Sequence, residues 1–333
     1  MPTEDITGSD QAAAGTAGAG GAGAGIPVAV ALSPHLDDAV FSAGGTLARL
    51  IDAGWRVRLV TVLTATVPRP AGFALACQLD KGLSAEVDYM ALRRAEDRRA
   101  AAALGCRAVD VMHLPLPEAP HRGYGSAAAL FAGIQENDPL PAATLAQEIA
   151  PWLTDADLLL HPLGLGGHVD HLLVNAAVDR LAYCPPRLRW RDTPYVLREP
   201  GQTGAVPQSE AARGRDGGPS RGAWWDVEIT ATLPRKLSAC AAYATQLGFQ
   251  FGGESAMREA LTGLARAEAE ASVTAAIGAT VDGDACGGLT QGGGAERGLA
   301  QRGGGRVERF WVLPTDAQAI RGREAGAGGG SVF

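Results

Sequence analysis

The sequence predicts an α/β fold with a doubly wound, mostly parallel sheet and helices on both of its faces. Short, continuous apolar runs alternate with longer segments of helical spacing, which is typical of strand-helix-strand units. Two polar motifs, at residues 33–38 and 161–171, begin where predicted strands end. Ligands of doubly wound sheets bind outside the carboxyl ends of the strands, so we expect both motifs to contribute to one site.

The first half of the chain supplies most of the predicted elements. Residues 26–33 (IPVAVALS) are apolar apart from the final serine, as expected of a strand buried on both faces. Residues 39–54 have helical spacing, residues 55–63 return to a strand pattern, and residues 89–105 are rich in helix formers and end at a glycine. The further predictions here are a loop or short helix at 69–83, a strand at 108–114, a helix at 140–152, a strand at 156–162 and a helix that begins within HVDH at 168–171.

We expect a single domain over residues 26–315, preceded by a disordered Gly/Ala leader at 1–25 and followed by a flexible tail at 316–333. Gly-rich insertions are predicted near 199–222 and 282–305. Between the two insertions we predict a strand at 224–229 and helices at 236–247 and 255–271. After the second insertion we predict a strand at 307–313. The last strand has a core-like pattern, which favours one domain with inserted loops over two independent domains.

Composition excludes several classes of function. The formal net charge is -7 and no basic stripe is present, so the sequence is not that of a nucleic-acid-binding protein. The uncharged stretch at 11–34 is mostly Gly and Ala and lacks both a basic n-region and an apolar h-region, so we expect neither a signal peptide nor a membrane span. The 5 cysteines include no C-x-x-C pair, which favours reduced thiols in a cytoplasmic protein.

The two polar motifs predict a metal site. Adjacent carboxylates at Asp37 and Asp38 repel each other unless a cation or a helix N-terminus offsets their charge. His35 and Asp38 are three residues apart and can reach one ion, and a histidine pair of the same spacing lies in HVDH. Hydrolytic zinc sites use three protein ligands and leave one position open, a count that His35, Asp38 and His171 meet.

This assignment leaves two side chains for proton transfer. Asp37 is the expected general base, and His168 is expected to stabilise an oxyanion or to protonate a leaving nitrogen. For either motif alone, a hydrogen-bonded histidine-carboxylate pair would be the simpler interpretation. The glycines at 164–167 do not fit a dinucleotide fingerprint, because its third glycine would fall on Val169, and we expect a close backbone approach there instead.

The segments SPHLDDAVFSAGG (33–45) and GGHVDH (166–171) resemble the two signature motifs of the PIG-L/LmbE family of zinc-dependent de-N-acetylases. The resemblance extends from Val28 to about Leu181 and implies a Rossmann-like layered sheet. It also implies one Zn²⁺ ion, bound by the three ligands proposed above, and the same roles for Asp37 and His168. Arg93 falls where the family often has an arginine that contacts the substrate. The sequence departs from many relatives at Leu36, where they have proline, and at Tyr243, where they have histidine.

The resemblance implies that the chain hydrolyses the N-acetyl amide of an N-acetylglucosaminyl conjugate and releases acetate and a free amino sugar. An apolar loop with Phe73, Leu75, Leu79 and Leu83 favours a bulky small-molecule glycoconjugate, such as a glycopeptide-antibiotic pseudoaglycone of the teicoplanin type. A mycothiol-, bacillithiol- or aminoglycoside-precursor conjugate is an alternative. A non-catalytic, metal-stabilised sugar-binding module is another, although a purely structural zinc would need neither Asp37 nor His168. An esterase or a phosphate-releasing hydrolase is a third.

Overall fold

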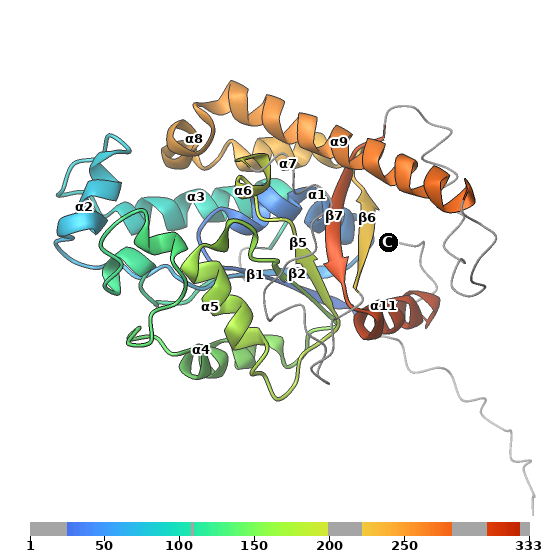
Figure 1. The fold of residues 1–333 in the computed structure, drawn as a ribbon, viewed down its shortest axis with the longest axis horizontal. Coiled ribbons are helices and arrows are strands. Elements are labelled where there is room, and N and C mark those ends of the chain that lie inside the picture. Colours follow the sequence, from blue (N-terminus) through green and yellow to red (C-terminus); the bar gives the residue numbers. More distant parts are fainter. Residues whose placement is uncertain (1–24, 108–109, 199–221, 282–304, 327–333) are drawn as a thin grey trace, which may run out of the picture.

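A computed structural model describes residues 25–107, 110–198, 222–281 and 305–326 (Figure 1). Its centre is a 7-stranded sheet in the order β3-β2-β1-β4-β5-β7-β6. The strands are β1 (Val28–Ser33), β2 (Arg56–Thr61), β3 (Val111–His113), β4 (Leu158–Pro162), β5 (Arg187–Trp190), β6 (Ala223–Glu228) and β7 (Val307–Val312). Strands β1 to β5 pair in parallel, whereas β7 is antiparallel to both of its neighbours. The prediction of a mostly parallel α/β sheet is therefore confirmed.

Strand β1 lies in the middle of the sheet and is buried on both faces, as its unbroken apolar run predicted. Ala29 and Ala31 point into one hydrophobic core, and Val30 and Leu32 point into the other. All 6 of its residues are buried. Because side chains alternate along a strand, one short run supplies both cores and fixes the strand between two layers of helices.

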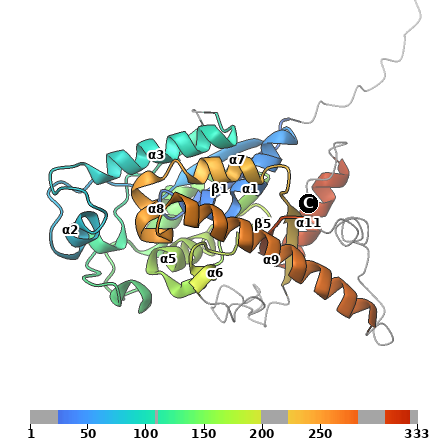
Figure 2. The ribbon, with the colours of Figure 1, turned by 90° about the horizontal axis from the view of Figure 1, so that it is seen from above.

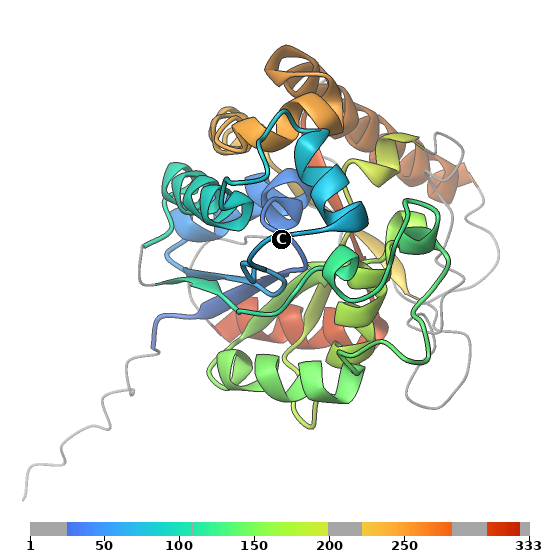
Figure 3. The ribbon, with the colours of Figure 1, turned by 90° about the vertical axis from the view of Figure 1, so that its left-hand side faces the viewer.

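The two faces of the sheet carry different sets of helices (Figures 2 and 3). One core packs α1 (Asp38–Asp52), α3 (Tyr89–Leu104), α7 (Leu233–Cys240), α8 (Ala244–Phe251) and the buried first half of α9 (Glu254–Val281) against the sheet. The other packs α4 (Ala142–Ile149) and α5 (Val169–Val178) against it. No helix of the described ranges has the length and apolar character needed to cross a membrane.

The segment at 69–83, predicted to be a loop or short helix, contains the short helix α2 (Gly72–Leu79). Two predicted elements differ from those observed. The helix predicted at 236–247 is two helices, because Tyr243 has a non-helical backbone and its buried hydroxyl donates to Asp97 Oδ1 at 2.6 Å. Residues 314–326 form helix α11 (Pro314–Gly326), so the prediction of a flexible tail from residue 316 is wrong for the start of that segment.

Helix α11 is held to the rest of the domain by apolar and charged contacts. Ile320 is buried in a hydrophobic core, Ala317 packs against the same core, and Asp316 lies 3.6 Å from the Arg187 guanidinium. With one large apolar anchor, this helix has almost no amphipathic pattern that the sequence could reveal. The predicted leader at 1–25 and the predicted insertions at 199–222 and 282–305 fall, apart from Gly25, Gly222 and Gly305, outside the described residues.

Candidate active site

The two motifs meet at the carboxyl edge of the sheet, as predicted. Strands β1 and β4 are parallel neighbours, with Ala29 opposite Leu158. The chain leaves β1 into His35 and leaves β4 through a short turn into His168 at the start of α5. The strand order reverses between β1 and β4, which makes this the switch point at which doubly wound sheets form their ligand sites.

The three predicted metal ligands lie together and are buried or nearly so. Asp38 Oδ2 is 3.2 Å from His35 Nδ1 and 3.3 Å from His171 Nε2. Ligand atoms of His35, His168 and His171 also lie within 4.8 Å of one another. His171 Nε2 is buried and has no hydrogen-bond partner among the described residues. An unpartnered imidazole nitrogen beside a carboxylate and a second imidazole is a donor set that suits zinc.

A second carboxylate orients each of the two histidines in the predicted ligand set, His35 and His171. Asp170 Oδ2 is 2.8 Å from His35 Nε2, and Asp192 Oδ1 is 2.7 Å from His171 Nδ1. Each carboxylate accepts a hydrogen bond from the N–H of the ring nitrogen farther from Asp38, so the other ring nitrogen keeps its lone pair. The sequence analysis missed both residues. Asp170 lies inside HVDH, and Asp192 is two residues beyond the strand RLRW, so the motif and the strand end were the available signals.

Asp192 also holds the turn that precedes α5, because its Oδ2 accepts the backbone N–H groups of Gly164 and Leu165 at 2.7 and 2.8 Å. We expect Asp192→Asn to weaken divalent-metal binding by about 10- to 100-fold, the usual cost of losing a partner of a ligating histidine. The measurement is competition for Zn²⁺ against a chromophoric chelator. Asp179→Asn removes a surface carboxylate, paired to Arg187 at 3.0 Å, and is the control. An unchanged zinc dissociation constant in Asp192→Asn would contradict the role.

Asp37 lies beside the predicted metal ligands but faces a different neighbour. Its Oδ2 is buried, has no hydrogen bond within the described structure, and is 3.6 Å from the Arg93 guanidinium. Burial, partly offset by Arg93, raises the pKa of Asp37 to about 7. The carboxyl group thus has an unused acceptor oxygen next to the predicted metal ligands.

His168 caps helix α5, and its ring lies beside those of His35 and His171. Its Nδ1 accepts a hydrogen bond from the Asp170 backbone N–H at 3.2 Å. Burial lowers the pKa of His168 to about 3, with a smaller contribution from His35. A neutral ring that accepts at Nδ1 carries its proton on Nε2, so His168 offers a hydrogen-bond donor to a ligand.

Arg93 projects from α3 and is buried, as expected of a residue at the site. It forms a short ion pair with Glu118, and its guanidinium carbon lies 5.4 Å from the centre of the Tyr89 ring. Glu118 and Asp37 therefore approach the same guanidinium. The adjacent Arg94 instead donates to the Thr64 carbonyl at 2.6 Å and to the Thr66 hydroxyl at 3.0 Å. The structure thus places Arg93, and not its neighbour, among the buried groups of the site.

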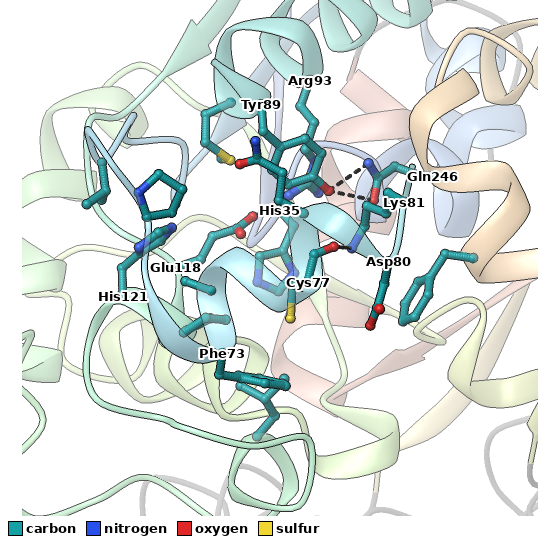
Figure 4. A pocket seen from close by; sticks show the side chains of 18 of the residues that line it. His35, Phe73, Cys77, Asp80, Lys81, Tyr89, Arg93, Glu118, His121 and Gln246 are labelled. Atoms are coloured by element: carbon teal, nitrogen blue, oxygen red, sulfur yellow. Dashed lines mark hydrogen bonds and ion pairs between the residues drawn. The ribbon is translucent and has the colours of Figure 1, made fainter. Parts of the chain in front are cut away.

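His35, Asp37, Asp38, Arg93 and His168 line a cavity of about 590 Å³, which Figure 4 shows from close by. Tyr89, Lys81 and Gln246 lie along one wall, and Glu118 and His121 lie toward the other. His121, which was not among the predicted site residues, also lines the cavity. Of the four apolar residues in the predicted rim loop, Phe73 lines the cavity, and Leu75, Leu79 and Leu83 do not.

Apolar side chains from distant parts of the chain complete the cavity. Phe131 and Leu130 come from the loop before α4, and Phe249 comes from α8. Phe249 is 61% exposed and Phe131 45%, although both line the cavity, so a ligand could cover them. Exposed aromatic rings beside a buried polar centre are typical of a site that binds a ligand with both polar and apolar parts.

Comparisons with known proteins agree with this geometry. Residues 30–182 match the family model of PIG-L, GlcNAc-PI de-N-acetylase. The chain is 29% identical over 219 residues to 2'-N-acetylparomamine deacetylase from Streptomyces fradiae, a match that covers 65% of this chain and 72% of that protein.

Two solved structures share the fold. That of the A40926 pseudoaglycone deacetylase Dbv21 has a TM-score of 0.60 and 23% identity, and covers 86% of this chain and 96% of its own. That of a teicoplanin-pathway deacetylase has a TM-score of 0.63 and 22% identity, and covers 85% of this chain and 96% of its own. The match of residues 30–182 to the PIG-L family model confirms the resemblance that the two motifs predict.

Proposed function

We propose that this chain is a zinc-dependent N-deacetylase that hydrolyses the N-acetyl amide of an N-acetylglucosaminyl conjugate. The observation that carries the proposal is the buried donor set of His35, Asp38 and His171, in which a carboxylate orients each imidazole. Asp37 and His168 are two further polar groups beside that set, and both line the same cavity. A site built only to stabilise the fold would need neither an unpartnered carboxylate oxygen nor an open cavity.

The reaction adds water across the amide bond. Asp37 accepts a proton from the attacking water, whose oxygen bonds to the acetyl carbon, and returns the proton to the nitrogen as the carbon–nitrogen bond breaks. His168 donates from Nε2 to the acetyl oxygen while that oxygen carries negative charge. A bound zinc ion would lower the pKa of a water and polarise the acetyl carbonyl. The products are acetate and the free amine.

Arg93 has a supporting place in this proposal. Its guanidinium lies 3.6 Å from Asp37, and the same side chain lines the cavity. A fixed positive charge there favours the ionised form of Asp37, which is the form that accepts a proton. Arg93 can also donate to a hydroxyl group of the sugar, the contact that its position in the family motif suggests.

The cavity favours a conjugate with a bulky, partly apolar aglycone. Phe73, Phe131 and Phe249 lie on its lining together with Val67, Pro68 and Pro70, far more apolar surface than one sugar ring requires. Binding energy from a remote aglycone can raise turnover as well as affinity. The structural relatives whose names mention a glycopeptide pseudoaglycone or the teicoplanin pathway support an antibiotic-biosynthesis substrate of this kind.

An aminoglycoside precursor is the second candidate substrate. The relative from Streptomyces fradiae is named as a deacetylase of 2'-N-acetylparomamine. The cavity lining includes the carboxylates of Asp80 and Glu86, which could pair with substrate amines. The two candidates make opposite demands on the cavity, because the first depends on its apolar rim and the second on its acidic residues.

A substrate panel with a rim variant tests these candidates. We expect the wild-type protein to release acetate faster from an N-acetylglucosaminyl glycopeptide than from free N-acetylglucosamine, a thiol-type conjugate or 2'-N-acetylparomamine. O-acetyl and phosphoryl glucosamine should not react. Phe73→Ala should lower kcat/KM for the glycopeptide by about 10-fold, because it removes roughly 1.4 kcal/mol of apolar contact. It should leave free N-acetylglucosamine unaffected.

The matched control is Leu92→Ala, which truncates an exposed leucine of α3 that does not line the cavity. The measurement is enzymatic detection of acetate under initial-rate conditions. Equal efficiency on all conjugates, unaltered by Phe73→Ala, would contradict an aglycone-binding rim. A preference for 2'-N-acetylparomamine would favour the aminoglycoside candidate.

A further inference from the structure

Tyr195 lies beside the proposed metal-ligand cluster of His35, Asp38 and His171, and the reaction proposed above gives it no role. It begins helix α6 (Tyr195–Arg198), which follows β5. Its ring centre is 5.5 Å from that of His171, edge-on, and 6.3 Å from that of His168. Tyr195 lines the cavity, and its hydroxyl has no hydrogen-bond partner among the described residues. A donor in contact with the cavity and without a protein partner is available to a ligand.

The turn that precedes helix α5 leaves room for the Tyr195 ring. Gly166 has a φ of 78°, a conformation that favours glycine. A Cβ atom at this position would lie 2.8 Å from Tyr195 Cγ, closer than packed carbon atoms approach. Phe131 also packs against the ring, with its ring centre 5.9 Å from that of Tyr195. The ring thus packs against a glycine that makes room for it and against an aromatic neighbour.

His168 is the other hydrogen-bond donor on this side of the cavity. Its Nδ1 is occupied by the Asp170 N–H, which leaves Nε2–H for a ligand. The ring centres of Tyr195 and His168 are 6.3 Å apart, and both residues line the cavity, so one small ligand group can reach both. Two donors that converge on one oxygen form an oxyanion hole, which stabilises negative charge that develops during acyl transfer.

We propose that Tyr195 is a further catalytic residue, whose hydroxyl donates a hydrogen bond to the acetyl oxygen of the substrate together with His168. The inference rests on the proposed deacetylase function. The bond is weak while the oxygen belongs to a neutral amide, and it strengthens when water adds to the carbonyl carbon and the oxygen becomes an anion. No proton leaves Tyr195. The residue therefore contributes to kcat and has little effect on the binding of the uncharged amide.

The phenol of Tyr195 is protonated at neutral pH, because the ordinary pKa of a tyrosine is about 10. The hydroxyl is therefore a donor across the neutral pH range. This behaviour separates Tyr195 from the carboxylates of the site, which can only accept while they are ionised.

Tyr195→Phe tests this role, because it deletes one oxygen and leaves the ring packed against Gly166 and Phe131. We expect kcat on an N-acetylglucosaminyl conjugate to fall by about 100-fold with KM changed by less than about 3-fold, as for other lost oxyanion donors. The dissociation constant of a methylphosphonamidate of glucosamine, which mimics the tetrahedral oxyanion, should rise by a similar factor. Bound zinc should remain at the wild-type level. Tyr183→Phe is the matched control, since that hydroxyl belongs to a tyrosine that is 54% exposed and does not line the cavity.

Three outcomes would overturn the role, and each is distinct. An unchanged kcat and an unchanged phosphonamidate affinity would show that the ring only packs. A rise in KM with kcat unchanged would show a contact to the ground state, such as a sugar hydroxyl. If the wild-type protein itself releases no acetate from any conjugate of the panel, the proposed function fails and this role fails with it.

Discussion

Asp37→Asn is expected to reduce kcat by about 100- to 10,000-fold, the usual contribution of a general base. Asparagine preserves the size and shape of the side chain but cannot accept a proton from water. The substitution leaves His35, Asp38 and His171 in place, so one equivalent of zinc should still bind. Arg93 would retain Glu118 as a charged partner. The measurement is single-turnover acetate release, alongside metal analysis of the same preparation.

The control for this variant is Asp155→Asn, which neutralises a surface carboxylate paired with Arg58 at 2.8 Å. It should retain wild-type turnover. Near-normal turnover of Asp37→Asn at saturating substrate would contradict the assignment of the base. His168 would then be the first residue to test in that role.

His171→Ala is expected to lose the bound metal, and with it all measurable turnover. His171 offers the unpartnered Nε2 atom, so its removal should weaken zinc binding by more than the roughly 10- to 100-fold that follows loss of an outer partner. Because His171 is fully buried, alanine also leaves a void that lowers stability. His171→Gln fills most of the void, so the loss of metal can be separated from the loss of packing.

The control for His171 is His113→Gln. His113 lies on β3, where its Nε2 is 2.8 Å from Asp97 Oδ2, away from the metal-ligand cluster. It should lower the free energy of unfolding without changing zinc content. Full zinc occupancy in folded His171→Gln would contradict the proposed ligand set.

The sequence predicted the parts of the fold and of the site that depend on local pattern. Strands buried on both faces leave unbroken apolar runs, so β1 and β4 were recognisable, and the polar motifs after them marked the carboxyl edge of the sheet. The ligand candidates followed because His35 and Asp38 are neighbours in sequence, as are His168 and His171. Parallel pairing of β1 with β4 then brings the two groups together.

The remaining parts depend on contacts between distant segments. Tyr195 and Asp192 enter the site only because β5 pairs with β4, and neither belongs to a spaced motif. Phe249 and Gln246 reach the cavity from α8, more than 150 residues beyond His35 and Arg93. The antiparallel strand β7 lies between β5 and β6, an order that no periodicity encodes. The sequence therefore predicted the polar centre of the site better than the walls of the cavity.

The most direct test of the account is a zinc titration of the metal-free protein with an N-acetylglucosaminyl glycopeptide as substrate. The protein is stripped with a chelator, and acetate release is measured as zinc is added back. We predict no turnover without metal and a linear rise in turnover that ends at about one equivalent of zinc, with Asp37→Asn binding the same equivalent and remaining almost inactive. Full acetate release by the stripped protein, or one bound zinc with no acetate release from any N-acetylglucosaminyl conjugate, would contradict a metal-dependent deacetylase.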